Sequence, residues 1–183
     1  MEFHEMNGPL AIQEYIQDHI RHNPNDIKKI IELPKGCDKT QWQYEHVKQF
    51  IIEINILVVK LRKVCNITTC PIMRVENESY KCTVHKEWRE CCAIEYMLHN
   101  LDNSTDMILA MKNNFNKMVG IENVIKSLHQ ICRRLYRLFS HAILYHKDTF
   151  TEFETEMVVY KRFYEFMLMF QILTADNLIK PFI

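Results

Sequence analysis

Glycine and proline are scarce in this chain, which has three glycines and five prolines among 183 residues. Because these residues form most tight turns, their scarcity disfavours a fold of many short strands and favours helices. Net charge is also absent, since 23 acidic and 23 basic side chains balance. Bulk charge therefore predicts no nucleic-acid or membrane partner, and any anion site must come from local clustering of cations.

Long uninterrupted apolar runs are missing as well. The most apolar stretch, MVVYKRFYEFMLMFQIL, contains Lys161, Arg162 and Glu165, so we expect no transmembrane segment. The first residues, MEFHEMNGPLAIQEY, lack the apolar core of a signal peptide. We therefore expect a cytoplasmic protein, in which disulfides are rare.

The apolar residues that are present recur at helical spacing. Every third or fourth residue is apolar along residues 41–64 and again along 121–139, which predicts two long amphipathic helices. Residues 157–172 are apolar almost all round, as in a helix buried on most sides. These helices indicate an all-α, mostly helical bundle with a short β-hairpin near residues 72–92.

We expect one domain over residues 1–183, with residues 1–9 as a flexible N-terminus. Further helical segments are predicted over residues 10–22 and 25–32 and from residue 93 onward.

Cys65 and Cys70, in KVCNITTCPIM, directly follow the helix predicted over residues 41–64. Four interpretations of these two cysteines are open at first: a disulfide, a redox pair, half of a metal site, or two buried thiols without a ligand. The expected compartment disfavours a disulfide, and their spacing differs from the C-x-x-C of a redox pair. By spacing, the best pair to complete a zinc site is His141 and His146, which also have four residues between them. Residues five apart point about 140° apart on a helix, so the helix must end or bend between these histidines if both bind one metal. The residues alone leave a metal site and ordinary thiols with unrelated histidines equally open.

A rival group is Cys82, His85 and Cys91 in CTVHKEWREC, whose spacing loosely fits a zinc knuckle. Because two metal ions in so small a chain are uncommon, we expect these cysteines to be buried packing residues.

Arg133, Arg134 and Arg137 lie within about one turn of the second long helix, opposite its apolar stripe. Three guanidinium groups on one patch suit an anion such as phosphate. A solvated basic face is the alternative that helical geometry leaves open.

Evidence for catalysis is thin. The sequence contains no nucleophile elbow, glycine-rich phosphate loop or H-E-x-x-H. Glu152, Glu154 and Glu156 suggest a solvated segment. A zinc ion held by four side chains has no open position for water, which argues against a zinc hydrolase, so we expect no enzyme.

Taken in order, several stretches resemble the Mob/phocein family, and specifically its phocein branch, over about residues 10–181. They are LAIQEYIQDHIR, LPKGCDKTQWQYEHVKQF, CNITTCPIM, CAIEYMLHNLD, ICRRLYRLFSHA and ADNLIKP. The resemblance implies a Mob-type fold with a core four-helix bundle. It also implies one structural zinc ion per chain, bound by Cys65, Cys70, His141 and His146.

The same resemblance implies a non-catalytic adaptor and co-activator of protein kinases. Phocein-like members belong to striatin-containing phosphatase–kinase assemblies (STRIPAK), so the implied partners are a striatin-type scaffold and a phosphorylated Ste20-like (germinal-centre) kinase. The family's phosphopeptide pocket corresponds here to Arg133, Arg134 and Arg137. The alternative is a purely structural scaffold-binding subunit without phosphopeptide recognition. Localisation would be cytoplasmic, with contact to membranes only through the complex.

Family members that activate NDR/LATS-type kinases present acidic residues around the start of the long helix. The corresponding residues here are Cys37, Gln41 and Gln49, next to Lys39 and Lys48. A basic kinase segment would find no carboxylates to pair with, so we do not expect an NDR/LATS-type partner.

Overall fold

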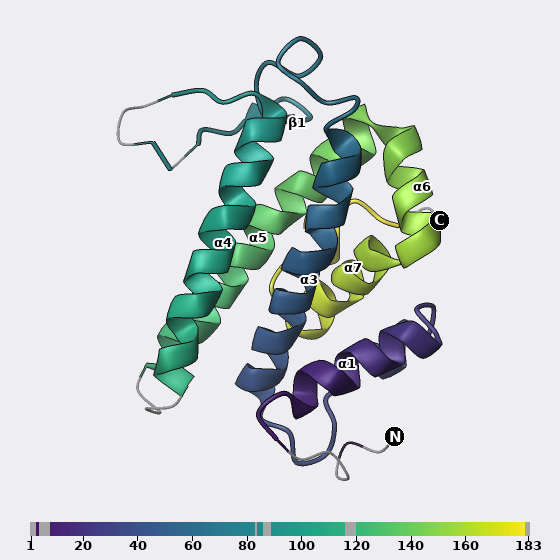
Figure 1. Ribbon diagram of the computed structural model, residues 1–183, viewed down its shortest axis with the longest axis vertical. Helices are drawn as coiled ribbons and strands as arrows, with labels where there is room; N and C mark the ends of the chain where they lie inside the picture. Colours follow the sequence, from purple (N-terminus) through teal and green to yellow (C-terminus); the bar gives the residue numbers. More distant parts are fainter. Residues whose placement is uncertain (1–2, 4–7, 83, 86–88, 116–119, 182–183) are drawn as a thin grey trace.

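The computed structural model describes residues 3, 8–82, 84–85, 89–115 and 120–181, with the side chains of residues 113–115 left aside. The expected flexibility of residues 1–9 therefore falls largely outside the described part. The described residues are mostly helical, as predicted (Figure 1). The α-helices are α1 (Ala11–His22), α2 (Ile27–Ile31), α3 (Lys39–Leu61), α4 (Ala93–Phe115), α5 (Ile121–Tyr145), α6 (Lys147–Met157) and α7 (Val159–Met169). No helix in these ranges is both long and apolar enough to cross a membrane.

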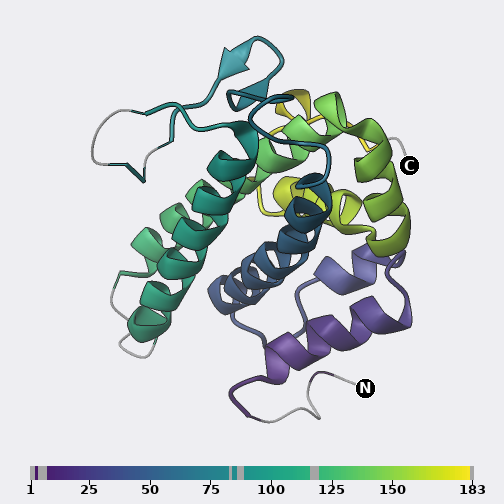
Figure 2. The ribbon, with the colours of Figure 1, turned by 45° about the horizontal axis from the view of Figure 1, so that its top comes forward.

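Helix α3 is the centre of the fold and packs against α1, α4, α5, α6 and α7. It begins where the Asp38 carboxylate accepts a hydrogen bond from the backbone N–H of Gln41 at 2.8 Å, which caps the helix. Its predicted apolar face is buried, from Val47 to Leu61. Helices α4 and α5 run beside it, and Figure 2 shows α1 and α2 together at one end of the molecule, away from α4.

Aromatic rings join the remaining helices to this core. Phe163 of α7 lies 5.1 Å, between ring centroids, from both Phe50 of α3 and Phe139 of α5. Helices α3, α4 and α5 pack against one another and α7 packs against α3, so these four helices form the core. The apolar stripe predicted for α5 is buried from Leu128 to Phe139. The exception at its start is Ile121, which is exposed.

The predicted start of the buried helix over residues 157–172 differs from the start observed in the structure. Helix α6, which the sequence analysis did not predict, ends at Met157, and α7 begins only at Val159. Between them Val158 adopts a left-handed conformation with φ of 51°, which turns the chain.

The prediction that Glu152, Glu154 and Glu156 form a solvated segment is wrong for Glu154. Its buried carboxylate accepts hydrogen bonds from the backbone N–H groups of Tyr160 at 2.7 Å and Lys161 at 2.8 Å. It therefore satisfies donors at the start of α7 that have no partner within the helix. Glu152 and Glu156 are exposed as expected, and both pair with Lys60 of α3.

The β-hairpin is confirmed but small. Strands β1 (Arg74–Val75) and β2 (Glu78–Ser79) pair antiparallel, with Arg74 opposite Ser79 and Val75 opposite Glu78. Within residues 80–82, 84–85 and 89–92 the chain adds no further strand before α4 begins.

A buried ion pair joins α7 to α3. The guanidinium of Arg162, which has no exposed surface, donates a hydrogen bond through Nη2 to the carboxylate of Glu53, which is also buried. The same guanidinium lies 5.5 Å from the ring centroid of Phe50, a cation–π contact. Neither residue can lose its partner without leaving a buried charge uncompensated.

We expect Arg162→Met to lower the free energy of unfolding by roughly 3–5 kcal/mol, because Glu53 then stays buried without a cation. The double variant Arg162→Met/Glu53→Leu should lose less than Arg162→Met alone, since no unpaired charge remains. Urea unfolding measures both. Lys60→Met removes a cation from an exposed ion pair and serves as the control. An equal loss in Arg162→Met and Lys60→Met would contradict the role given to the buried pair.

His46 of α3 is a buried histidine between aromatic rings. Its ring centroid lies 4.6 Å from that of Trp42 and 5.3 Å from that of Phe166. Burial, and then the charge of Arg162, lower the pKa of His46 to about 3, although a hydrogen bond with the backbone of Ile30 acts in the opposite direction. His46 is therefore neutral in the folded protein at physiological pH.

This pKa predicts an acid sensitivity. Above about pH 6.5 His46 is neutral in both states, whereas between about pH 6.5 and 3 the unfolded chain binds a proton that the folded chain does not. Stability should therefore fall with decreasing pH, by up to about 1.4 kcal/mol per pH unit from this residue. His46→Phe should reduce the slope between pH 6 and 5 by about that amount, measured by urea unfolding at each pH. Parallel slopes in the two proteins would contradict the assignment.

Candidate functional site

The loop after α3 places Cys65 and Cys70. The Asn66 side-chain oxygen accepts hydrogen bonds from the backbone N–H groups of Thr68 and Thr69, at 2.9 and 3.1 Å. The Thr69 hydroxyl accepts one from the N–H of Asn66 and donates one to the carbonyl of Val64, each at 2.9 Å. Two small polar side chains thus close the loop and fix the two buried cysteines that flank it.

His141 and His146 come from the end of α5. The helix ends at Tyr145, and His146 has φ of −138° and ψ of 47°, outside the helical region. The expectation that the helix ends or bends between the two histidines is therefore confirmed. Nδ1 of His141 lies 2.7 Å from the backbone oxygen of Arg74 in β1. Because a carbonyl only accepts, Nδ1 carries the proton and Nε2 keeps its lone pair for another partner.

The four side chains converge on one point. Sγ of Cys65 lies 3.7 Å from Nε2 of His141, and Sγ of Cys70 lies 3.4 Å from Nε2 of His146. All four ligand atoms lie within 4.8 Å of one another. A tetrahedral zinc ion, with bonds of about 2.3 Å to sulfur and 2.0 Å to nitrogen, would separate sulfur and nitrogen by about 3.5 Å. The group can therefore hold a metal ion, while the binding of zinc stays a prediction.

Burial sets the protonation of the ligand groups when no metal ion is bound. Burial, and then the electrostatic interaction with Cys70, raise the pKa of the Cys65 thiol to about 12. Burial also lowers the pKa of both His141 and His146. At neutral pH the histidines are thus neutral, as metal ligands must be, and the Cys65 thiol loses its proton only if a cation stabilises the thiolate.

A second group of ligand atoms also forms. Cys82 and Cys91, which we expected to be packing residues, meet His85 and also His99 of α4. All four ligand atoms lie within 4.8 Å of one another. Both cysteines are buried, as expected, but their sulfurs face imidazole nitrogens as well as apolar groups. Sequence reasoning missed His99, because its spacing from Cys91 crosses from a loop into a helix and matches no short ligand pair.

A basic pocket of about 250 Å³ lies between α4, α5 and the segment before α4. Its lining residues are Lys81, Tyr96, Asn100, Gln130, Arg133, Arg134 and Arg137. The structure thus brings the three predicted arginines to one cavity and adds a fourth cation, Lys81, that the sequence analysis did not name. Its sequence signal is weak, since Lys81 lies outside the helix that carries the arginines.

The arginines are held differently from the expectation that all three face away from the core. Arg133 is exposed, but Arg134 and Arg137 are half-buried and reach α4. Nη1 of Arg134 donates to the side-chain oxygen of Asn103 at 2.6 Å, and Nη1 of Arg137 donates to the hydroxyl of Tyr96 at 3.1 Å. The Arg137 guanidinium also lies 4.5 Å from the ring centroid of Tyr80.

These partners are neutral. Within the described ranges, no salt bridge joins Arg133, Arg134 or Arg137 to a carboxylate. The three arginines therefore keep their positive charge, and an anion that binds them would not have to break an ion pair of theirs.

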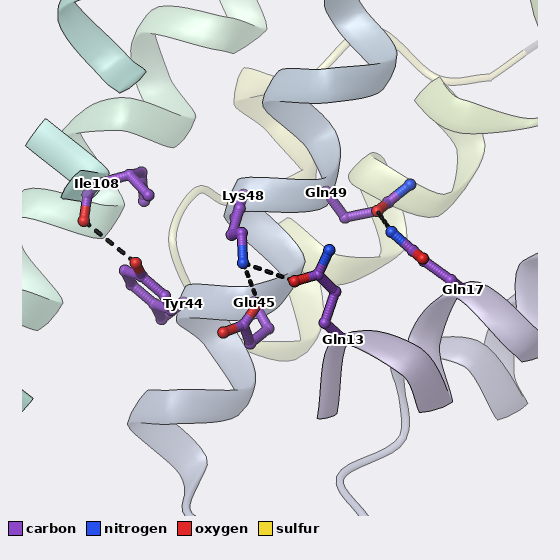
Figure 3. Close-up of polar contacts among 7 residues, drawn as sticks. All are labelled: Gln13, Gln17, Tyr44, Glu45, Lys48, Gln49 and Ile108. Carbon is purple, nitrogen blue, oxygen red and sulfur yellow. Dashed lines mark hydrogen bonds and ion pairs between the residues drawn. The ribbon is translucent and has the colours of Figure 1, made fainter. Parts of the chain in front are cut away.

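The surface near the start of α3 is partly covered by α1 (Figure 3). Nζ of Lys48 donates to the side-chain oxygen of Gln13 at 2.7 Å and lies 3.1 Å from the Glu45 carboxylate. The Gln49 side-chain oxygen accepts from Gln17 at 3.1 Å. Lys48 and Gln49 thus contact α1, and Glu45 is largely buried beside Lys48. That no NDR/LATS-type kinase binds here stays a prediction.

On the other side of α3, the Tyr44 hydroxyl donates to the backbone oxygen of Ile108 at 3.2 Å (Figure 3). This bond fixes the first half of α3 to α4, the helix that forms one wall of the basic pocket.

Comparison with known proteins matches residues 18–181 to the Mob1/phocein family. A Drosophila melanogaster protein described as MOB kinase activator-like 4 is 38% identical over 179 residues, which cover 97% of this chain and 80% of that protein. A Caenorhabditis elegans protein described as MOB-like protein phocein is 38% identical over 183 residues, 99% of this chain and 82% of that protein. The human protein described as MOB kinase activator 3A is 27% identical over 163 residues, 84% of this chain and 75% of its own length.

We expect His146→Ala to remove one bound metal ion per chain, because three remaining ligands bind a structural metal much more weakly. The melting temperature should fall by about 10 °C or more, since each kcal/mol shifts it by roughly 2–4 °C in a chain of this size. Elemental analysis and thermal unfolding measure the two effects. His22→Ala, at an exposed histidine of α1, is the control. Unchanged metal content in His146→Ala would refute the assignment.

Proposed function

Because the chain belongs to the Mob1/phocein family, we propose that it is a non-catalytic adaptor of protein kinase complexes. Relatives of this chain are named kinase activators, and the relation covers nearly the whole chain. The candidate site fits this role, because it combines a closed metal group with an open basic pocket. The metal-ligand group would hold the ends of α3 and α5 together, and the basic pocket offers a surface that a negatively charged partner can occupy.

Zinc is the ion that suits Cys65, Cys70, His141 and His146. Two thiolates and two imidazoles are the donor set of structural zinc sites, and their charge cancels that of the ion, which eases burial. Four protein ligands leave no position for a reacting water, so the ion would act on structure alone. Bound there, it would fix the end of α3 to the end of the helix that carries the arginines.

The observation that carries the proposal is the basic pocket itself. Four cations line it, namely Lys81, Arg133, Arg134 and Arg137. Arg134 and Arg137 contact the neutral side chains of Asn103, Tyr96 and Tyr80. A phosphorylated threonine carries about −1.5 to −2 charges and three acceptor oxygens. Guanidinium groups bind such oxygens through paired, charge-assisted hydrogen bonds.

The aromatic side chains around Arg137 prepare the pocket for this contact. Tyr80 lies against its guanidinium and the Tyr96 hydroxyl accepts one of its N–H groups. The group is therefore oriented before a ligand arrives, which lowers the entropy lost on binding.

The ligand we propose is a phosphorylated segment of a Ste20-like kinase, and the second partner is a striatin-type scaffold in a STRIPAK assembly. The likeness to the phocein-named relative supports this choice over an NDR/LATS-type kinase. The absence of carboxylates at Cys37, Gln41 and Gln49 supports it as well.

The test is the binding of fluorescent phosphothreonine peptides from Ste20-like kinases, followed by anisotropy. We expect Arg134→Ala and Arg137→Ala to weaken binding roughly 10- to 100-fold each, because each removes charge-assisted hydrogen bonds to the phosphate. Affinity should also fall with rising salt. Arg21→Ala, at an exposed arginine of α1, matches the charge change and should leave affinity unchanged.

The unphosphorylated peptide separates the proposal from its alternative, a structural subunit that binds the scaffold and reads no phosphate. Equal affinity for both peptides at every salt concentration would favour that alternative. Wild-type affinity in both pocket variants would remove the arginines from the mechanism.

A further inference from the structure

We propose that Cys82, His85, Cys91 and His99 bind a second zinc ion, beside the first metal group and separate from it. The group lies at the start of α4. Three of its members belong to the segment between β2 and α4, and His99 lies in the second turn of α4. The resemblance to the Mob/phocein family implies one zinc ion per chain, so this proposal adds one.

The geometry matches that of the first group. Nδ1 of His99 lies 3.4 Å from Sγ of Cys82 and 3.7 Å from Sγ of Cys91. Nε2 of His85 lies 3.0 Å from Sγ of Cys91. A tetrahedral zinc ion would place sulfur and nitrogen about 3.5 Å apart, so small movements of the side chains bring all four atoms into position.

The donor set and its surroundings favour zinc over simple packing. Cys82 and Cys91 are buried, while His85 and His99 are half-buried, and packing alone gives no reason for four lone-pair atoms to converge. Thiolate and imidazole ligands select zinc over calcium or magnesium, which prefer oxygen. On binding, the two thiols release their protons to water, and two thiolates then balance the two charges of the ion.

A metal ion here would also shape the basic pocket. Lys81 precedes Cys82 and Asn100 follows His99, and both line that pocket. Tyr80, whose ring lies against Arg137, is two residues before Cys82. The ion would thus fix the segment that carries Tyr80 and Lys81 to α4, the opposite wall of the pocket.

The test is the zinc content of the whole protein, purified without chelators and under reducing conditions. We expect two zinc ions per chain in the wild type and one in Cys82→Ser/Cys91→Ser. Cys92→Ala removes an adjacent buried cysteine that is not in the group, and it should retain two. One zinc ion in the wild type, or loss of zinc in Cys92→Ala together with full retention in Cys82→Ser/Cys91→Ser, would overturn the proposal.

Two measurements on the wild type keep the proposal testable if the double variant does not fold. Anomalous diffraction at the zinc edge should give two peaks, one of them among Cys82, His85, Cys91 and His99. Mass spectrometry of the unreduced protein should find both cysteines as thiols after the metal is removed. A single peak at the first group, or a disulfide between Cys82 and Cys91, would overturn the second site.

Discussion

The convergence of Cys65, Cys70, His141 and His146 is the contact on which the rest of the structure depends. It joins the loop after α3 to the end of α5. The hairpin reaches the same point through the Arg74 carbonyl, which holds His141. The start of α4 reaches it through the N–H of Ala93, which donates to the carbonyl of Cys70 at 2.9 Å. Helix α6 begins at Lys147, directly after His146. The ends of several helices are therefore set by one small group of side chains.

The position of α4 against α5 follows from this arrangement, and the basic pocket lies between these two helices. Arg134 and Arg137 belong to α5, but their partners Asn103 and Tyr96 belong to α4. A rotation of either helix would separate each guanidinium from the group that orients it. The metal-ligand group and the pocket are thus structurally linked. Packing at the helix ends fixes the positions of α4 and α5, and these positions determine where the guanidinium groups of the pocket lie.

Much of the helical framework could be predicted, because burial of one helix face leaves a repeating pattern in the sequence. The faces of α3 and α5 illustrate this. The pattern could not predict that Glu154 and Arg162 are buried. A charged side chain is expected to be exposed unless its buried partner is known, and that partner can lie far away in the sequence. Glu53 is that partner for Arg162. His99 and Lys81 were missed for a related reason, because each acts beside residues that only the packed fold brings near. The end of α6 and the start of α7 depend on the left-handed backbone of Val158. The sequence does not predict this conformation, because β-branched residues rarely adopt it.

The two ligand groups differ in how much chain they enclose, and this difference bears on the order of assembly. In the first group, Cys65 and His141 lie 76 positions apart, so its ligands meet only when the end of α3 and the end of α5 come together. In the second, Cys82 and His99 are 17 residues apart, and all four ligands lie within that interval. Closing a short loop costs less entropy than closing a long one. The second group can therefore gather at the start of α4 with few long-range contacts, whereas the first needs two distant helix ends to meet.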